Sequence, residues 1–174
     1  VAAGITVATL EAALGAGPVV RTIPNTPAQI GRGVTVAVAN PSVTEAQKQA
    51  ATELLGAIGM VEWVDDEALI DAATAVSGSG PAYVFHVVEC MAEAGRRAGL
   101  PEDLAMRIAR GTVAGAGALL DATETDAATL RQNVTSPGGT TAAALGVLMD
   151  GDAMQTLFAN AIAAAAKRAR ELGS

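Results

Sequence analysis

A segment rich in glycine and hydroxyl side chains leads into an apolar helical run in the last third of the chain. It spans Asn133–Leu145 and reads NVTSPGGTTAAAL. At a helix start the first backbone N–H groups lack an intrahelical partner, and the peptide dipoles leave positive potential. Gly138 and Gly139 let a ligand approach the main chain, and Thr140 and Thr141 add hydroxyl donors. The segment predicts a carboxylate pocket with one special hydroxyl, and its lack of basic side chains disfavours a multiply charged phosphate.

A second glycine-rich segment, Ser77-Gly78-Ser79-Gly80-Pro81, precedes another helical run. Pro81 suits the first turn of that helix, where its missing N–H costs nothing, and Ser79 or Gly80 would cap it. Taken alone, this segment is typical of a cap and a turn. Two such segments in one helical domain favour a shared site.

The other chemistry-bearing residues give weaker signals. Glu124 lies in a turn before the Asn133 segment, and its residue type leaves two interpretations open: a carboxylate that faces a cationic nitrogen on a ligand, or a solvated turn residue. His86 is the only histidine and lies in an apolar helical pattern, which favours a structural role. Cys90 is the only cysteine, and its apolar surroundings predict a buried, inert thiol. With one His and one Cys, we expect no zinc site and no Cys/His nucleophile.

Composition limits the function classes. The 174 residues carry a net charge of −7, which argues against nucleic-acid binding because that requires a basic patch. We find no apolar run long enough to span a membrane and no signal-like start. The lone cysteine suits a reducing compartment, so we expect a cytoplasmic protein. Hydrophobic residues make up 51% and aromatics 2%, which predicts closely spaced helices packed through small side chains.

The elements that must position these residues fall into two regions. Residues 1–64 alternate strand and helix signals and predict an α/β domain. The expected strands are 5–7, 19–23, 34–39 and 61–64, and the expected helices are 10–14 and one that runs to Ile58 behind a capping box at Ser42–Glu45. A glycine-rich strand-to-helix turn of the G-x-G-x-x-G kind is missing from this region. We therefore expect the second half of a nucleotide-binding domain.

Residues 65–174 switch to helical periodicity, which predicts an all-α domain. Asp126 is expected to cap one short helix, and the other expected helices are 67–76, 82–98, 104–120, 141–148 and 153–172. The helix 104–120 carries Gly111, Gly115 and Gly117, so one side of it is nearly smooth. Such a face lets another helix come close, which predicts a central position for this helix.

Three motifs together resemble pyrroline-5-carboxylate reductase. They are Val76–Tyr83, Leu130–Thr141, which is the family's signature, and the loop Pro24-Asn25-Thr26-Pro27 after a strand. The resemblance runs over the whole chain. It implies reduction of the C=N bond of 1-pyrroline-5-carboxylate to L-proline with NADPH or NADH, the last step of proline biosynthesis. It also implies a Rossmann-type domain followed by a helical domain of the 6-phosphogluconate dehydrogenase C-terminal type that forms a homodimer, and such dimers can assemble into decamers.

Carried over residue by residue, the resemblance implies a set of site residues. The substrate carboxylate would bind Ser136 and the backbone N–H groups around Gly138, Gly139 and Thr140. The Thr141 hydroxyl would meet the ring nitrogen, with Glu124 near it. Two segments would lie towards the nicotinamide of the cofactor: Pro24, Asn25, Thr26 and Pro27, and Ser77, Gly78, Ser79 and Gly80. No metal is implied.

An alternative from another class stays open for this chain. In it, the protein is a non-catalytic helical oligomerisation module, both glycine-rich segments are caps, and the smooth helix is an interface. The missing cofactor motif supports this alternative.

Overall fold

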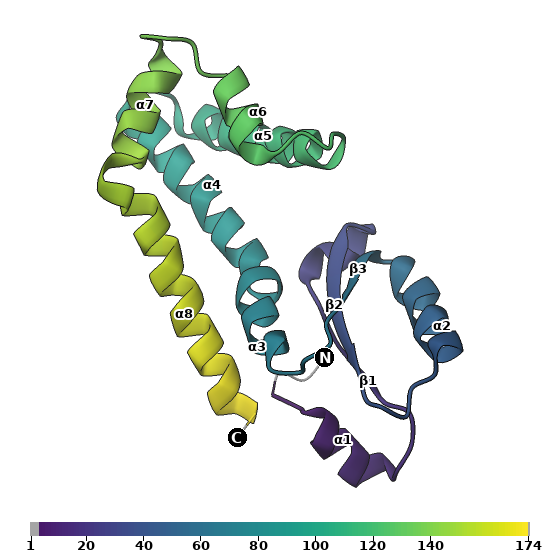
Figure 1. Ribbon diagram of the computed structural model, residues 1–174. Helices are drawn as coiled ribbons and strands as arrows, with labels where there is room; N and C mark the ends of the chain where they lie inside the picture. Colours follow the sequence, from purple (N-terminus) through teal and green to yellow (C-terminus); the bar gives the residue numbers. More distant parts are fainter. Residues whose placement is uncertain (1–3, 174) are drawn as a thin grey trace. The chain divides into compact units, whose positions relative to one another are not determined.

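A computed structural model describes residues 4–173 of the chain (Figure 1). Strands occur only in the first part of the described chain, and helices make up most of the remainder. In chain order the elements are α1 Val7–Leu14, β1 Val20–Pro24, a 3₁₀ turn Thr26–Ile30, β2 Gly33–Ala39, α2 Glu45–Gly56, β3 Gly59–Trp63, α3 Leu69–Ala73, a π-helical turn Thr74–Gly78, α4 Gly80–Arg97, α5 Glu102–Asp121, α6 Ala127–Asn133, α7 Thr140–Leu148, a 3₁₀ turn Asp150–Asp152 and α8 Ala153–Gly173. The predicted order, an α/β region followed by an all-α region, is confirmed.

The contacts divide the chain into two compact units. The first comprises residues 1–81 with residues 160–174, and the second comprises residues 82–159. The sequence predicts a domain boundary between residues 64 and 65, where the pattern of apolar residues becomes that of helices. This boundary stays a prediction.

A three-stranded sheet in the order β1-β2-β3 forms the centre of the first unit. β1 runs antiparallel to β2, with Val20 opposite Ala39, and β3 runs parallel to β2. Because side chains alternate along a strand, the sheet has two apolar faces. On one face Val36 and Val38 of β2 pack with Ile70 of α3. On the other face Trp63 donates its Nε1–H to Thr52 of α2 at 2.9 Å, so helices cover both faces (Figure 1).

Two half-buried or buried polar side chains tie the segments around this sheet. The Glu67 carboxylate accepts hydrogen bonds from the Arg21 guanidinium and from the Val7 backbone N–H, each at 2.7 Å. Asn40, at the end of β2, accepts from the Val19 N–H at 3.0 Å and donates to the Glu11 carboxylate at 2.6 Å. Such bonds offset the cost of burying polar groups and fix how the connecting segments lie on the sheet.

Three local predictions in the first unit are wrong. The expected strand at residues 5–7 does not form, because Thr6 caps α1 and accepts a hydrogen bond from the Thr9 N–H. The capping box lies two residues later than expected, with Thr44 as the cap and Gln47 as its partner. The expected break at residues 77–81 is mostly helical, since a π-helical turn and the start of α4 occupy it.

The start of α5 approaches the end of α4 at a place where the side chains are small. A Cβ at Gly95 of α4 would lie 3.2 Å from Leu100, in the connection between the helices, and 3.5 Å from Ala105 of α5. Ala92 of α4 and Ala105 and Ala109 of α5 are buried. The prediction of closely spaced helices with small residues is confirmed at this place.

The glycines further along α5 do not behave as predicted. A Cβ at Gly111, Gly115 or Gly117 would meet no atom within 4 Å, and the helix is largely exposed along this stretch. The expectation of a central helix is therefore wrong for this chain taken by itself. Large apolar side chains are exposed nearby on α5, with Leu119 at 52% and Leu120 at 49% of their full accessibility. These small and apolar residues, which lie around the helix, form the exposed apolar surface of α5 in the described chain.

Candidate functional site

The segment between α6 and α7 is held in shape by its own backbone. The Thr135 N–H donates to the Gln132 carbonyl at 2.9 Å, and the Thr135 hydroxyl donates to the Arg131 carbonyl at 2.6 Å, which closes the end of α6. The chain then turns at Ser136, whose carbonyl accepts from the Gly139 N–H at 3.1 Å. Gly138 has φ +70°, a left-handed conformation that favours glycine. A short, defined turn thus leads into α7.

The start of α7 presents open hydrogen-bond donors. Gly139 is the cap residue, so no cap side chain occupies the first N–H groups of the helix. The hydroxyls of Ser136, Thr140 and Thr141 form no hydrogen bond with any residue in 4–173. Ser136 and Thr140 are exposed, whereas Thr141 is half-buried. The predicted helix start is confirmed, and its donors are available to an anion.

Ser136 and Gly139 are packed against each other. A Cβ at Gly139 would lie 2.5 Å from the Ser136 Oγ and 3.2 Å from the Ser136 carbonyl oxygen. Any side chain at residue 139 would therefore push the serine hydroxyl away from the helix start. The structure brings these two predicted site residues together, and glycine at this position keeps the serine where it is.

Glu124 lies in the exposed turn between α5 and α6. The hydroxyls of its neighbours Thr123 and Thr125 are 2.8 Å apart, and the Thr125 N–H donates to Thr123. Among residues 4–173, no hydrogen bond or ion pair joins Glu124 to Thr141. The two sequence-based interpretations of Glu124 both stay predictions.

The other predicted site segments meet in the first unit. Asn25 follows β1 directly, and Thr26 and Pro27 open the 3₁₀ turn after it. The Asn25 Nδ2 donates to the carbonyl oxygen and to the hydroxyl of Ser77, each at 3.2 Å. Its Oδ1 accepts from the Val34 N–H at 2.9 Å. Pro24–Pro27 and Ser77–Gly80, which are separate in the sequence, thus lie side by side at the end of β1.

A π-helical turn shapes the Ser77 segment. The Ser79 N–H donates to the Thr74 carbonyl at 2.8 Å, a bond that spans five residues instead of four. Such single turns inside helices are frequent at functional sites. Sequence reasoning missed this turn, although the serine–glycine run before Pro81 marks where the regular α-helical pattern breaks.

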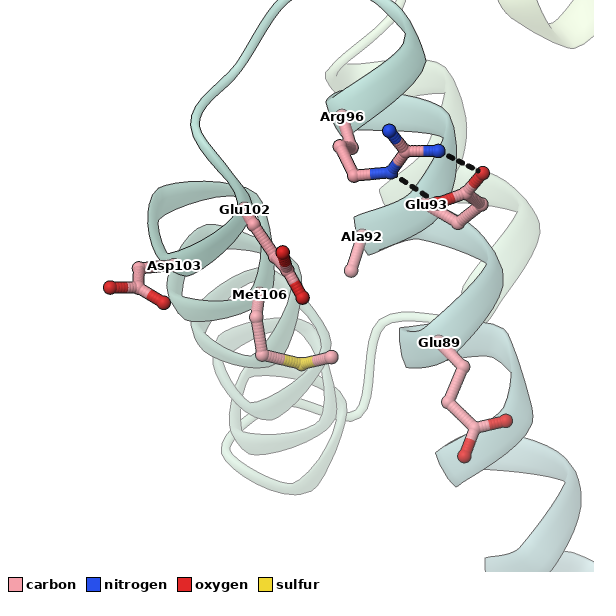
Figure 2. A pocket seen from close by; sticks show the side chains of 7 residues that line it. All are labelled: Glu89, Ala92, Glu93, Arg96, Glu102, Asp103 and Met106. Carbon is pink, nitrogen blue, oxygen red and sulfur yellow. Dashed lines mark hydrogen bonds and ion pairs between the residues drawn. The ribbon is translucent and has the colours of Figure 1, made fainter.

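A cleft of about 440 Å³ lies between the end of α4 and the start of α5 (Figure 2). Glu102 and Met106 point from α5 towards α4, while Glu93 is held by Arg96. The pKa of the Glu93 carboxyl is lowered to about 2, first by the hydrogen bond from Arg96 and then by that from Arg97. Four acidic side chains and one arginine line the cleft, and none of the predicted site residues does. This charge disfavours an anionic ligand.

His86, Glu89 and Cys90 form an exposed cluster on α4, which corrects one prediction. The His86 Nδ1 lies 2.9 Å from the Glu89 Oε2, and the His86 Nε2 lies 3.6 Å from the Cys90 Sγ. Cys90 is exposed, so the expectation of a buried thiol is wrong. Cys90 and His86 are in contact because residues four apart share a helix face, and the expectation that they form no nucleophile pair stays a prediction.

Metal binding and membrane insertion each require a feature that the described part of the chain lacks. Within residues 4–173, no three His, Cys, Asp or Glu side chains are grouped so as to hold a metal ion. No helix in this part of the chain combines the length and apolar character needed to cross a lipid bilayer.

Comparison with known proteins gives a consistent result. A family model described as pyrroline-5-carboxylate reductase dimerisation matches residues 67–172. A pyrroline-5-carboxylate reductase from Pseudomonas aeruginosa is 46% identical over 173 residues, which cover 99% of this chain and 63% of the relative. One from Pisum sativum is 42% identical, with 99% of this chain and 62% of the relative covered. The chain thus spans less than two thirds of the length of these relatives.

Solved structures agree with the sequence relatives. A pyrroline-5-carboxylate reductase from Coxiella burnetii superposes with a TM-score of 0.94 at 41% identity, covering 98% of this chain and 63% of the other. A pyrroline carboxylate reductase from Plasmodium falciparum, solved with NADP bound, gives a TM-score of 0.84 at 29% identity, covering 99% of this chain and 65% of the other.

Proposed function

We propose that this chain, which belongs to the pyrroline-5-carboxylate reductase family, is the substrate-binding and dimerisation part of an enzyme that reduces 1-pyrroline-5-carboxylate to L-proline. The observation that carries the proposal is the start of α7. There the hydroxyls of Ser136, Thr140 and Thr141, beside a helix N-terminus capped by glycine, form no hydrogen bond within residues 4–173. The chain spans only part of its relatives' length, so we assign the nucleotide phosphate-binding turn to a segment outside residues 1–174.

The carboxylate of the substrate binds at the start of α7 in this proposal. The backbone N–H groups around Gly138–Thr140 and the Ser136 hydroxyl donate hydrogen bonds to it. A carboxylate at a helix N-terminus gains about 0.3 to 1 kcal/mol from the dipole, and about 2 kcal/mol where partly buried. Hydrogen bonds to an ionised acceptor add to this and fix the orientation of the ring.

Thr141 acts at the other side of the substrate ring. Hydride addition to a C=N carbon is easier when the nitrogen is protonated, so a protein group that orients and stabilises the iminium accelerates the reaction. The half-buried Thr141 hydroxyl, in the first turn of the helix, accepts a hydrogen bond from this nitrogen. Glu124 favours the cation by its charge, directly or through water.

NADH or NADPH supplies the hydride when bound. The chain's own residues fit the nicotinamide end of such a cofactor at the carboxyl end of β1, where Pro24–Pro27 and Ser77–Gly80 lie together. These segments exclude water from one side of the ring and position it.

The exposed apolar face of α5 supports assembly as a homodimer through the helical domain, with decamers as a further level. Leu119, Leu120 and the three open glycines would be covered by a second copy. The same face supports the alternative of a non-catalytic oligomerisation module. A single thiol suits a cytoplasmic location.

The test compares two proteins. One is the 174-residue chain, and the other is the same chain extended at its N-terminus by the preceding segment of the Pseudomonas aeruginosa relative. NAD(P)H oxidation with 1-pyrroline-5-carboxylate is measured for each, with the complete relative as positive control. We expect activity only in the extended protein. If the extended protein is folded and dimeric but inactive, the oligomerisation module is the better description.

A further inference from the structure

We propose that Asn25 is a positioning residue, which holds the Ser77–Gly80 segment at the end of β1 through its own carboxamide. The inference rests on the proposed function and gives Asn25 a role that acts through Ser77. All three of its hydrogen bonds are made within the protein: Oδ1 accepts from the Val34 N–H at 2.9 Å, and Nδ2 donates twice to Ser77 at 3.2 Å. The side chain is half-buried, so these bonds are partly protected from water.

The Ser77 carbonyl needs such a donor because of the residue four positions after it. In an α-helix this carbonyl would accept from the N–H of residue 81, which is Pro81 and has none. Asn25 lies 52 residues earlier in the chain and donates to this oxygen. The break in the helical hydrogen-bond pattern and the asparagine that compensates for it thus form one unit.

The π-helical turn packs against β1 beside the hydrogen bond between Asn25 and Ser77. A Cβ at Gly78 would lie 3.4 Å from the Thr74 Cγ2 and 3.7 Å from the Ile23 Cγ1, so the backbone of the π-helical turn runs close to β1. The Thr74 hydroxyl donates to the Ile70 carbonyl at 2.7 Å, which anchors the start of the turn. Asn25 fixes the other end. Losing it frees the part of the turn that the proposed cofactor site requires.

The experiment compares matched asparagine variants in the extended protein. Asn25→Ala removes the carboxamide under study. Asn40→Ala removes a buried asparagine, which also makes three hydrogen bonds between segments of the same unit but lies at the opposite end of the β1–β2 pair. KM for NAD(P)H, KM for 1-pyrroline-5-carboxylate, kcat and the thermal midpoint are measured for each. Hydrogen–deuterium exchange of residues 74–80 is measured without any cofactor.

We expect Asn25→Ala to raise KM for NAD(P)H about tenfold and to speed exchange in residues 74–80, because the segment loses its fixed position. Asn40→Ala should lower the thermal midpoint without either change. Asn25→Asp keeps an acceptor for the Val34 N–H but sets an oxygen against the Ser77 carbonyl, so it should act in the same direction even if the alanine variant folds poorly.

The inference is overturned if exchange in residues 74–80 is unchanged in both Asn25 variants, or if Asn40→Ala shifts KM for NAD(P)H equally. Failure of the proposed function looks different: the unmodified extended protein would then lack activity. In that case the exchange measurement still decides whether Asn25 holds the segment.

Discussion

The two glycine- and serine-rich segments of this protein resemble each other in sequence but differ in how their polar groups are used. In Ser77–Gly80, the Ser77 carbonyl and hydroxyl are bonded to Asn25, and the Ser79 N–H is bonded within the π-helical turn. At the start of α7, the hydroxyls of Ser136, Thr140 and Thr141 are free within residues 4–173. A segment whose polar groups are already hydrogen-bonded within the protein is suited to pack against a ligand as a fixed surface. A segment with open donors is suited to bind a ligand directly.

The largest effect should come from Thr141→Val, which removes the open hydroxyl that the proposed function sets beside the ring nitrogen. Valine is nearly isosteric, so the thermal midpoint should hardly change. We expect kcat/KM for 1-pyrroline-5-carboxylate to fall about 100-fold, the size typical for the loss of one preorganised hydrogen-bonding group. Steady-state kinetics of the extended protein measure this. An unchanged kcat/KM would remove Thr141 from the mechanism.

A smaller effect is expected from Gly139→Ala. The new methyl group would lie 2.5 Å from the Ser136 Oγ, so the serine must move and the carboxylate pocket is distorted. We expect KM for the substrate, and Kd for proline measured by calorimetry, to rise about tenfold.

Gly146→Ala is the matched control for this change, because it adds the same methyl group to α7 where nothing lies within 4 Å. It should leave KM unchanged and stabilise the helix by up to about 1 kcal/mol. Equal KM values for the two variants would contradict the anion pocket and, with it, the contrast between the two segments.

The smallest effect concerns Glu93 in the cleft of Figure 2, where its carboxylate is paired with the Arg96 guanidinium. Bonds from Arg96 and Arg97 lower the pKa of Glu93 from 4.5 to about 2. A lowered pKa in the folded state means that the carboxylate contributes stability above pH 4.5 and loses this contribution as pH falls towards 2.

Glu93→Gln should therefore lower the thermal midpoint slightly at pH 7, with a difference that shrinks between pH 4.5 and 2 and also shrinks at high salt. Thermal melts over this pH range, in about 0.1 M and about 1 M salt, measure it. A difference that persists at pH 2 would mean that packing, and not charge pairing, explains the effect.

Much of the local structure was predictable from the sequence. Asp126 caps α6 through bonds to Thr129, and α7 begins at Thr140, within one residue of the expected position. These features depend on residues that are neighbours in the chain. The strand at residues 5–7 was mispredicted for a related reason, since threonine is β-branched like many strand residues but its hydroxyl can also cap a helix, as that of Thr6 does.

Exposure was less predictable, because it depends on what the rest of the chain covers. Cys90 and the glycines of α5 lie in apolar sequence patterns, yet both are exposed in this chain. An apolar pattern indicates that a face is to be covered. It does not indicate whether the same chain or a second copy covers it.

The sequence by itself determined the helix start at which we propose that the carboxylate binds, because this start, its glycines and its hydroxyls are encoded in the consecutive residues 136–141. Only the tertiary structure decided what Asn25 does. Its partner Ser77 is 52 positions away, and the two meet because the packing of α3 on the sheet brings the π-helical turn to the end of β1. Hydrogen bonds between distant residues depend on that packing, and no local pattern specifies it.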